Sequence, residues 1–350
     1  MKALVWTENK ALEYKEVEEP QIQKNNDVKI KIYGTGICGT DLNVLKGKMY
    51  AAPNMVMGHE SVGEEVRNVT VGDRVVIDPT QFCGKCYYCR KGLTCYCEEF
   101  DEWQLGIGAH GTFGEYYVGE DRFIYKLPES MEWERATLIE PLSCVLSVIE
   151  KANIKPDDSV LVLGSGPIGL LVQMIARKLS RITVATEIGP FRAEAARKIT
   201  KYVYHPQKLT LEEIYRINQG RKFDVIFDAI GNQLDWAYPL IEKGGRLIPM
   251  GFDDTYEFTV KPFELLSKGI TIIGTGEAHH MMERALSCAI DLPELSNLIT
   301  EKVALENFDT AIDNLMGFDP TTNKRKEINS IKTILVSEPI VSKKGSGASF

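Results

Sequence analysis

The sequence SVLVLGSGPIGLLVQMIARKLSRITVATEIG at residues 159–189 predicts a strand, a glycine-rich turn, a helix and a second strand. One apolar run, Val160 to Leu163, leads into the turn, and another covers Ile182 to Ala185. This order is a βαβ unit, in which a crossover helix joins two parallel strands. Further apolar runs at FDVIFDAIG, GGRLIPMGF and GITIIGTGE alternate with segments of helical periodicity. We therefore expect an α/β architecture with a doubly wound parallel sheet.

The turn carries a G-x-G-x-x-G motif, Gly164-Ser165-Gly166-Pro167-Ile168-Gly169. This pattern is specific for dinucleotides when a strand precedes it and a helix follows, since the pyrophosphate then meets the positive helix N-terminus. Glu187, at the end of the second strand, is expected to accept hydrogen bonds from ribose hydroxyls and to repel a 2'-phosphate, which favours NAD over NADP. Arg192 is a further candidate for cofactor binding, although it can also be a solvated helix residue.

Four cysteines follow a C-x2-C-x2-C-x7-C spacing within QFCGKCYYCRKGLTCYC: Cys83, Cys86, Cys89 and Cys97. Clustered thiols in a long chain indicate metal or redox chemistry more often than free or disulfide-bonded cysteines. The spacing fits one tetrahedral Zn²⁺ ion with four sulfur ligands. Cys95 lies inside the last spacer and competes as the fourth ligand, and we prefer Cys97. Residues 83–97 are therefore predicted to form a structural zinc lobe.

Composition limits the class of protein. The chain has 350 residues, 44% of them hydrophobic, so it can bury the cores of two domains. A formal net charge of -8 without a basic face argues against a nucleic-acid partner. The first residues do not resemble a signal peptide, and no apolar stretch has the length of a membrane span. We expect a cytoplasmic protein whose eight cysteines are reduced.

A second set of metal-binding residue types lies outside the cysteine lobe. Cys38 occurs in GICGTD, His59 and Glu60 in GHE, and Glu140 in IEP. A thiolate, an imidazole and carboxylates are the mixed ligands of an open, catalytic zinc site. Each of these residues alone would be unremarkable, but together with a dinucleotide motif and a four-cysteine lobe they predict a catalytic metal.

These motifs together resemble the zinc-containing medium-chain alcohol dehydrogenases, in the branch of sorbitol and other polyol dehydrogenases. The resemblance covers nearly the whole chain. It implies a GroES-like β-barrel catalytic domain, a Rossmann domain that binds NAD, and an active site in the cleft between them. The expected bounds are 1–142 for the catalytic domain, 143–292 for the Rossmann domain, 293–340 for a return to the catalytic domain, and 341–350 for a disordered tail.

The resemblance also implies roles for the site residues. Liver-type enzymes have a cysteine where this chain has Glu140, whereas polyol dehydrogenases have glutamate. In the polyol branch Cys38, His59 and Glu60 would hold the zinc, and Glu140 would bind its water or exchange with it; which glutamate is the direct ligand stays open. The zinc would act as a Lewis acid. Thr40 would relay the hydroxyl proton, and Asp41 would orient His59 or cap a turn.

Three departures from the family pattern are expected to matter. Asn43 replaces a histidine found in many relatives, so the usual exit of the proton relay is in doubt. The stretch from His59 to Asp73 is several residues short, which predicts a trimmed hairpin. His279 and His280 follow the last expected Rossmann strand and could reach the cofactor or a subunit interface.

The leading hypothesis is a zinc-dependent enzyme that transfers hydride between a secondary alcohol of a polyol, sugar or cyclitol and NAD. The alternatives are a dehydrogenase of an aminocyclitol such as 2-deoxy-scyllo-inosamine or of a phosphorylated polyol, a catalytically silent protein that binds NAD and zinc, and a zinc-free quinone or enoyl reductase. Two zinc ions per chain and a homodimer or homotetramer paired through strand 269–276 are expected. Candidates for the cleft wall are Tyr50, Phe100, Trp103 and Glu277.

Overall fold

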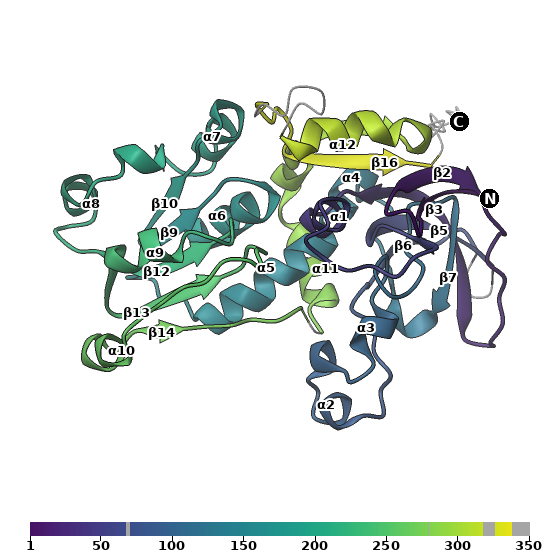
Figure 1. Ribbon diagram of the computed structural model, residues 1–350, viewed down its shortest axis with the longest axis horizontal. Helices are drawn as coiled ribbons and strands as arrows, with labels where there is room; N and C mark the ends of the chain where they lie inside the picture. Colours follow the sequence, from purple (N-terminus) through teal and green to yellow (C-terminus); the bar gives the residue numbers. More distant parts are fainter. Residues whose placement is uncertain (68–70, 279, 318–325, 338–350) are drawn as a thin grey trace, which may run out of the picture.

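The computed structural model describes residues 1–67, 71–278, 280–317 and 326–337. Figure 1 shows two halves side by side: the middle of the chain forms the half on the left, and the N-terminal part forms the half on the right together with the last strand, β16. The expected tail at 341–350, His279 and part of the shortened hairpin lie outside the described residues. No helix among the described residues is long and apolar enough to cross a membrane.

The middle half is built on a parallel sheet with strand order β11-β10-β9-β12-β13-β14 in the described chain. The chain moves outward from β9 in one direction and then from β12 in the other, so the topological switch point lies between these two strands. All residues of β9 are buried, as expected for a strand covered on both faces. The strands are β9 (Ser159–Leu163), β10 (Ile182–Thr186), β11 (Tyr202–Tyr204), β12 (Phe223–Asp228), β13 (Ile241–Pro249) and β14 (Thr271–Ile272).

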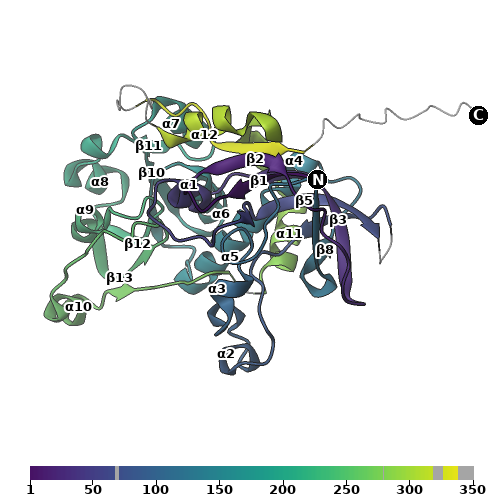
Figure 2. The same cartoon turned by 45° about the vertical axis from the view of Figure 1, so that its right-hand side comes forward.

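Helices cover both faces of this sheet. The long helix α5 enters from the other half and packs against α6 and α11, so it joins the two halves through one hydrophobic core. Figure 2 shows α5 and α6 beside the sheet, with α11 next to α5. The helices are α5 (Ile139–Ala152), α6 (Pro167–Leu179), α7 (Pro190–Arg197), α8 (Leu211–Ile217), α9 (Leu234–Ala237), α10 (Pro262–Lys268) and α11 (Met282–Ile290).

The other half is mainly antiparallel. One sheet has the order β15-β16-β3-β5-β6-β8, with β7 also paired to β3, and a smaller sheet has the order β2-β1-β4. Strands β15 and β16 come from the end of the chain, and β16 pairs with β3. The strands are β1 (Lys2–Trp6), β2 (Leu12–Glu16), β3 (Asp27–Gly36), β4 (Met55–Val56), β5 (Glu60–Arg67), β6 (Arg74–Ile77), β7 (Tyr116–Glu120), β8 (Ile124–Lys126), β15 (Ile299–Ala304) and β16 (Lys332–Val336).

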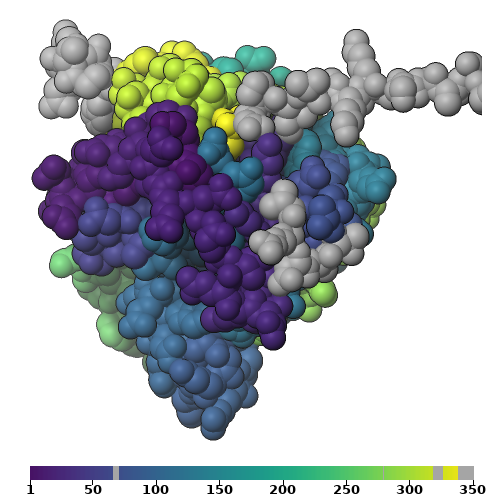
Figure 3. All heavy atoms as spheres, turned by 90° about the vertical axis from the view of Figure 1, so that its right-hand side faces the viewer, coloured from purple at the N-terminus to yellow at the C-terminus, as the bar shows by residue number. Residues whose placement is uncertain are grey.

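Short helices connect these strands. They are α1 (Gly39–Leu45), α2 (Tyr87–Arg90), α3 (Phe100–Trp103), α4 (Trp133–Ala136) and α12 (Phe308–Met316). Helices α2 and α3 belong to a small lobe that projects from the body of the molecule, at the bottom of Figures 1, 2 and 3. This lobe contains the four-cysteine segment.

The strand expected over residues 269–276 is much shorter than predicted. Only Thr271 and Ile272 pair with β13, and the chain then leaves the sheet. Gly276 has a φ of +61°, a conformation that ends extended structure. Ile272 is exposed at this sheet edge, and the expected pairing of two copies along it stays a prediction.

Candidate active site and zinc-binding residues

The register of two strands brings together three of the predicted ligands. Strands β3 and β5 are antiparallel, and Gly36 at the end of β3 lies opposite Glu60 at the start of β5. Cys38 follows β3 directly and is the N-cap of α1. One ligand atom each from Cys38, His59 and Glu60 therefore lies within 4.8 Å of the other two.

Asp41 contacts two residues of this cluster, Cys38 and His59. Its Oδ2 atom accepts a hydrogen bond of 2.8 Å from the backbone N–H of Cys38, and Oδ1 lies 3.9 Å from Nδ1 of His59. The carboxylate is 1% exposed, and neither Oδ1 of Asp41 nor Nδ1 of His59 has a hydrogen-bond partner among the described residues. Asp41 thus caps the turn and also faces the imidazole, so both roles considered for it are compatible with its position.

Glu140 and Thr40 lie at the border of the cluster. Glu140 is in the first turn of α5, and burial together with the charge of Glu60 raises its pKa to about 8. It is not among the three residues whose ligand atoms lie within 4.8 Å of one another. Oγ1 of Thr40 lies 3.6 Å from Sγ of Cys38. Cys144, one turn along α5, was not predicted as a neighbour, and its Sγ lies 3.6 Å from Oε1 of Glu140.

Lys332 is the site residue that sequence reasoning missed. It is the first residue of β16, and its ammonium group pairs with Glu60 and donates a hydrogen bond of 2.9 Å to the carbonyl of Ile37. The side chains of Lys332 and Glu60 are each only 2% exposed. A Cβ on Gly36 would lie 2.7 Å from Cε of Lys332, so the glycine leaves room for the pair. The only signal in the sequence was a lysine inside the apolar run IKTILV.

In the zinc-free protein, Lys332→Met is expected to lower the free energy of unfolding by roughly 3 to 5 kcal/mol, because it leaves the Glu60 carboxylate buried without its partner. Urea denaturation measures this loss. Lys332→Arg should retain most of the stability. The matched control is Lys302→Met, because Lys302 forms a half-exposed pair with Glu134 and should contribute no more than about 1 kcal/mol. Equal stability of the two methionine variants would contradict the prediction.

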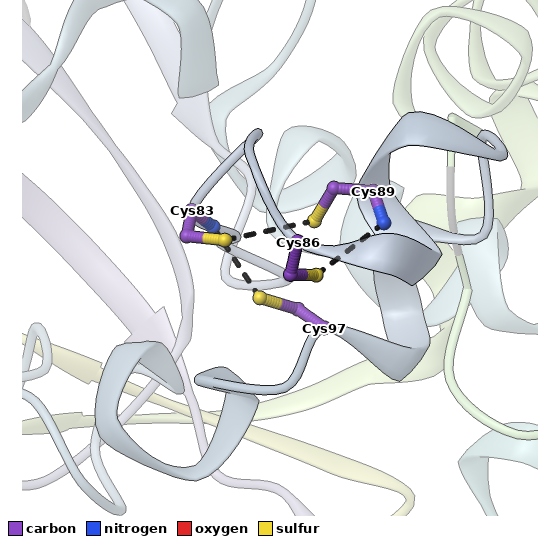
Figure 4. A group of neighbouring side chains, drawn as sticks. All are labelled: Cys83, Cys86, Cys89 and Cys97. Carbon is purple, nitrogen blue, oxygen red and sulfur yellow. Dashed lines mark hydrogen bonds between the residues drawn. The ribbon is translucent and has the colours of Figure 1, made fainter.

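The four lobe cysteines converge on one point, as Figure 4 shows. Sγ of Cys83 lies 4.0 Å from Sγ of Cys89, and the backbone N–H groups of Cys83 and Glu99 each donate to Sγ of Cys97 at 3.4 Å. Backbone N–H groups also lower the pKa of Cys86 to about 6. Cys95 is buried but is not part of this group.

Both clusters fit zinc in the chemistry of their donors. Four sulfur atoms whose mutual distances stay below 4.8 Å match a closed, structural site. One thiol, one imidazole and one carboxylate match a catalytic site that keeps a position open for a ligand. The buried Nδ1 of His59, which lacks a hydrogen-bond partner among the described residues and faces Asp41, is also typical of a metal-binding histidine with a carboxylate neighbour.

The glycine-rich loop has the geometry that a dinucleotide requires. Gly164 has a φ of +86°, and a Cβ on Gly169 would lie 2.9 Å from the carbonyl carbon of Gly164, so a side chain does not fit there. Gly166 is the N-cap of α6, Pro167 is its first residue, and Ile168 packs against the core. A Cβ on Gly166 would lie 3.6 Å from Nη1 of Arg192, so this arginine borders the N-terminus of α6.

Glu187 and Arg192 are both engaged within the protein. The Glu187 carboxylate accepts hydrogen bonds from the backbone N–H groups of Ser165, Ile188 and Gly189 at 2.8, 2.9 and 2.8 Å. Nε of Arg192 donates to the carbonyl of Ser330 at 3.0 Å, so it bridges the two halves and is not a solvated helix residue. Both residues line a hollow of about 610 Å³ beside the loop.

The other predicted positions are distributed more widely. Tyr50 is 77% exposed, which argues against a place in the cleft wall. Trp103 lines a separate groove of about 770 Å³ near the N-terminus, and Phe100 is in the same short helix. Asn43 is partly buried in α1. The ring of His280 contacts Phe82 edge-on, with 6.0 Å between centroids.

Comparison with known proteins identifies the family. Residues 24–129 match the alcohol dehydrogenase GroES-like domain, and residues 167–291 match the zinc-binding dehydrogenase domain. D-xylulose reductase A of Aspergillus oryzae is 34% identical over 249 residues, which are 66% of this chain and 68% of that protein. The chain belongs to the zinc-containing medium-chain alcohol dehydrogenase family. The family, the GroES-like and Rossmann-type folds, and the enzymatic class predicted from the sequence are therefore confirmed.

Other similar proteins of this dehydrogenase family cover almost the whole chain. Sorbitol dehydrogenase of Bacillus subtilis is 27% identical over 334 residues, 91% of this chain and 94% of that protein. Among solved structures, an alcohol dehydrogenase of Escherichia coli CFT073 in complex with NADH is 26% identical, with a TM-score of 0.84 over 96% of this chain and 99% of that one. The protein is accordingly a zinc-dependent alcohol oxidoreductase of the polyol dehydrogenase branch.

Proposed function

We propose that the protein oxidises a secondary hydroxyl group of a polyol, sugar alcohol or cyclitol with NAD as hydride acceptor. The observation that carries this proposal is the cluster of Cys38, His59 and Glu60 with Glu140 beside it. A carboxylate at the position where liver-type relatives have a cysteine favours a substrate with several hydroxyl groups. The similarity to sorbitol dehydrogenase and D-xylulose reductase supports the same substrate class.

Cys38, His59 and Glu60 would hold the catalytic zinc, and Glu140 would exchange with one of its ligands. When bound, the zinc supplies a Lewis acid that makes a substrate hydroxyl more acidic. Thr40, whose Oγ1 atom lies 3.6 Å from Sγ of Cys38, would receive the hydroxyl proton. Asp41 accepts a hydrogen bond from the backbone N–H of Cys38, and it would orient His59 from a distance of 3.9 Å. A second zinc at Cys83, Cys86, Cys89 and Cys97 would stabilise the lobe.

The proposed division of the chain separates the parallel sheet from the two sheets of the other half. A catalytic domain comprises residues 1–142 and 293–340, because β15 and β16 extend the sheet that contains β3. A cofactor domain comprises residues 143–292 and contains the parallel sheet. Helix α5 crosses the boundary. Within the cofactor domain, the loop at 164–169 would bind the pyrophosphate and Glu187 the adenosine ribose.

Glu187→Ala is expected to weaken NAD binding about tenfold or more and to narrow the preference for NAD over NADP, since charge-assisted hydrogen bonds contribute roughly 1.5 to 3 kcal/mol. The three backbone N–H groups now held by the carboxylate would also lose their partner, so the loop should become less ordered. Cofactor titration followed by fluorescence measures both affinities. Glu194→Ala, an exposed change on the same helix as Arg192, is the control. A wild-type preference for NADP would contradict the role of Glu187.

A screen of polyols and inositols with NAD and NADP, read by absorbance of the reduced cofactor, tests the proposed function. We expect NAD-dependent turnover of a polyol or cyclitol by the zinc-loaded enzyme. The second candidate is a phosphorylated polyol, because D-arabitol-phosphate dehydrogenase of Enterococcus avium is 29% identical over 90% of this chain and 91% of that protein. Turnover of sugar-alcohol phosphates alone would favour that candidate.

A further inference from the structure

We propose that Gln173, a buried glutamine of α6, is a positioning residue that holds the glycine-rich loop in the shape that binds the cofactor's pyrophosphate. Its side chain is 0% exposed, so it cannot touch a bound dinucleotide and acts instead through Ser165 of the loop. This inference rests on the proposed function, in which residues 164–169 bind the pyrophosphate. It adds a residue that fixes the shape of this site from inside the protein.

Gln173 lies on a helix face that is otherwise apolar. It is one turn of α6 beyond Gly169, and α6 packs against β9 and β10, beside which Figure 1 shows it. The other buried residues of α6 are Gly169, Leu170, Leu171, Val172, Met174, Ile175 and Ala176. A buried side-chain amide among such neighbours needs a polar partner.

Gln173 finds this partner in the glycine-rich loop. Its Nε2 atom donates a hydrogen bond of 3.1 Å to Oγ of Ser165, which is itself 0% exposed. The same hydroxyl donates to the carbonyl of Thr186 at 3.4 Å, and the backbone N–H of Ser165 donates to Oε2 of Glu187 at 2.8 Å. The carbonyl of Thr186 also accepts a bond of 3.0 Å from the N–H of Gly164. A chain of hydrogen bonds therefore joins α6, the loop and the end of β10.

This chain of hydrogen bonds connects the two proposed binding points of the cofactor. The loop would bind the pyrophosphate and Glu187 the adenosine ribose, and Ser165 belongs to the loop and also contacts Glu187. A dinucleotide must meet both points at once, so a loop that is already fixed relative to β10 loses less freedom on binding. Gln173 restrains the side chain of Ser165, whose Oγ is bonded on two sides. Without Gln173 the loop should be freer and the affinity for the cofactor lower.

The amide of Gln173 is incompletely bonded, so stability does not account for it. Its Oε1 atom is buried and has no hydrogen-bond partner in the part of the chain that the structure describes. A buried acceptor without a partner is destabilising, and an apolar side chain of similar size would avoid that cost. Ser165 would still have the Thr186 carbonyl as acceptor for its hydroxyl proton. Relative to leucine, Gln173 should therefore favour cofactor binding without stabilising the fold.

Gln173→Leu separates these two effects. We expect the dissociation constant of NADH, measured by fluorescence titration of the zinc-loaded enzyme, to rise about three- to tenfold, which corresponds to one neutral hydrogen bond. The melting temperature should rise or stay within about 2 °C of the wild-type value. The dissociation constant of adenosine, which has no pyrophosphate, should change less than about twofold. Met174→Leu, an apolar change at the next buried residue of α6, is the matched control and should bind NADH as wild type does.

Ser165→Ala is an independent test, because it removes the hydroxyl that Gln173 contacts. The affinity for NADH should fall by a similar factor, and Gln173→Leu in this background should weaken binding no further. In the cofactor-free enzyme, hydrogen exchange at the backbone N–H groups of Gly164 and Ser165 should be faster in Gln173→Leu than in wild type.

Three results would overturn the inference and leave the proposed function intact. They are wild-type affinity for NADH in Gln173→Leu, independent and additive losses of affinity in the double variant, and a lower melting temperature of Gln173→Leu with unchanged affinity, which would make Gln173 a purely structural residue. Binding of neither NADH nor NADPH by the wild type would instead refute the proposed function, and this inference with it.

Discussion

Cys38→Ser should reduce kcat by about a thousandfold or more, while NAD binding stays within about twofold of wild type. Loss of one ligand weakens a Lewis acid that contributes several kcal/mol to catalysis, and each 1.36 kcal/mol corresponds to a factor of ten. The glycine-rich loop is in the other half of the molecule, so the affinity for NAD should not depend on this sulfur. Steady-state kinetics and cofactor titration measure the two quantities.

Cys288→Ser is the matched control for this change. Cys288 is a partly buried thiol on α11 and does not belong to either cysteine-containing ligand group. Its replacement should leave kcat close to the wild-type value. If metal-replete Cys38→Ser protein turned over at the wild-type rate, the assignment of Cys38 to a catalytic zinc would be wrong.

Cys89→Ser should lower the free energy of unfolding by more than about 4 kcal/mol, because loss of a structural metal is among the few single changes with so large an effect. Structural zinc contributes directly to folding, and the fourth thiolate closes the site. The zinc content should fall from two ions per chain to about one. Thermal unfolding and metal analysis by mass spectrometry provide the measurements.

Cys95→Ser separates the metal effect from the cost of changing any buried thiol in the lobe. Cys95 is as buried as Cys97 but lies outside the group of four. We expect a loss of at most about 2 kcal/mol and an unchanged zinc content. If Cys89→Ser retained its melting temperature and both zinc ions, the lobe would not be a structural zinc site.

Features that depend on residues close together in the sequence could be predicted from it. The strand at residues 159–163 reads as a continuous apolar run because helices cover both faces of a parallel sheet. Gly164 and Gly169 follow from the tight turn between strand and helix. The cysteines at 83–97 meet because their spacers are too short to separate them. The predicted extent of β14, residues 269–276, was wrong, because apolar residues continue past the point where the chain leaves the sheet.

The sequence by its local patterns thus determined the fold class, the glycine-rich loop and the set of candidate metal ligands. The tertiary structure alone decided which distant residues surround those ligands. Lys332 reaches Glu60 because β16 pairs with β3, and Thr275 and Gly276 meet α5 and the cysteine lobe through Lys151 and Tyr96. Contacts of this kind join residues that are far apart in the chain. They depend on how the sheets and helices pack against one another, and the spacing of residues along the sequence does not reveal that packing.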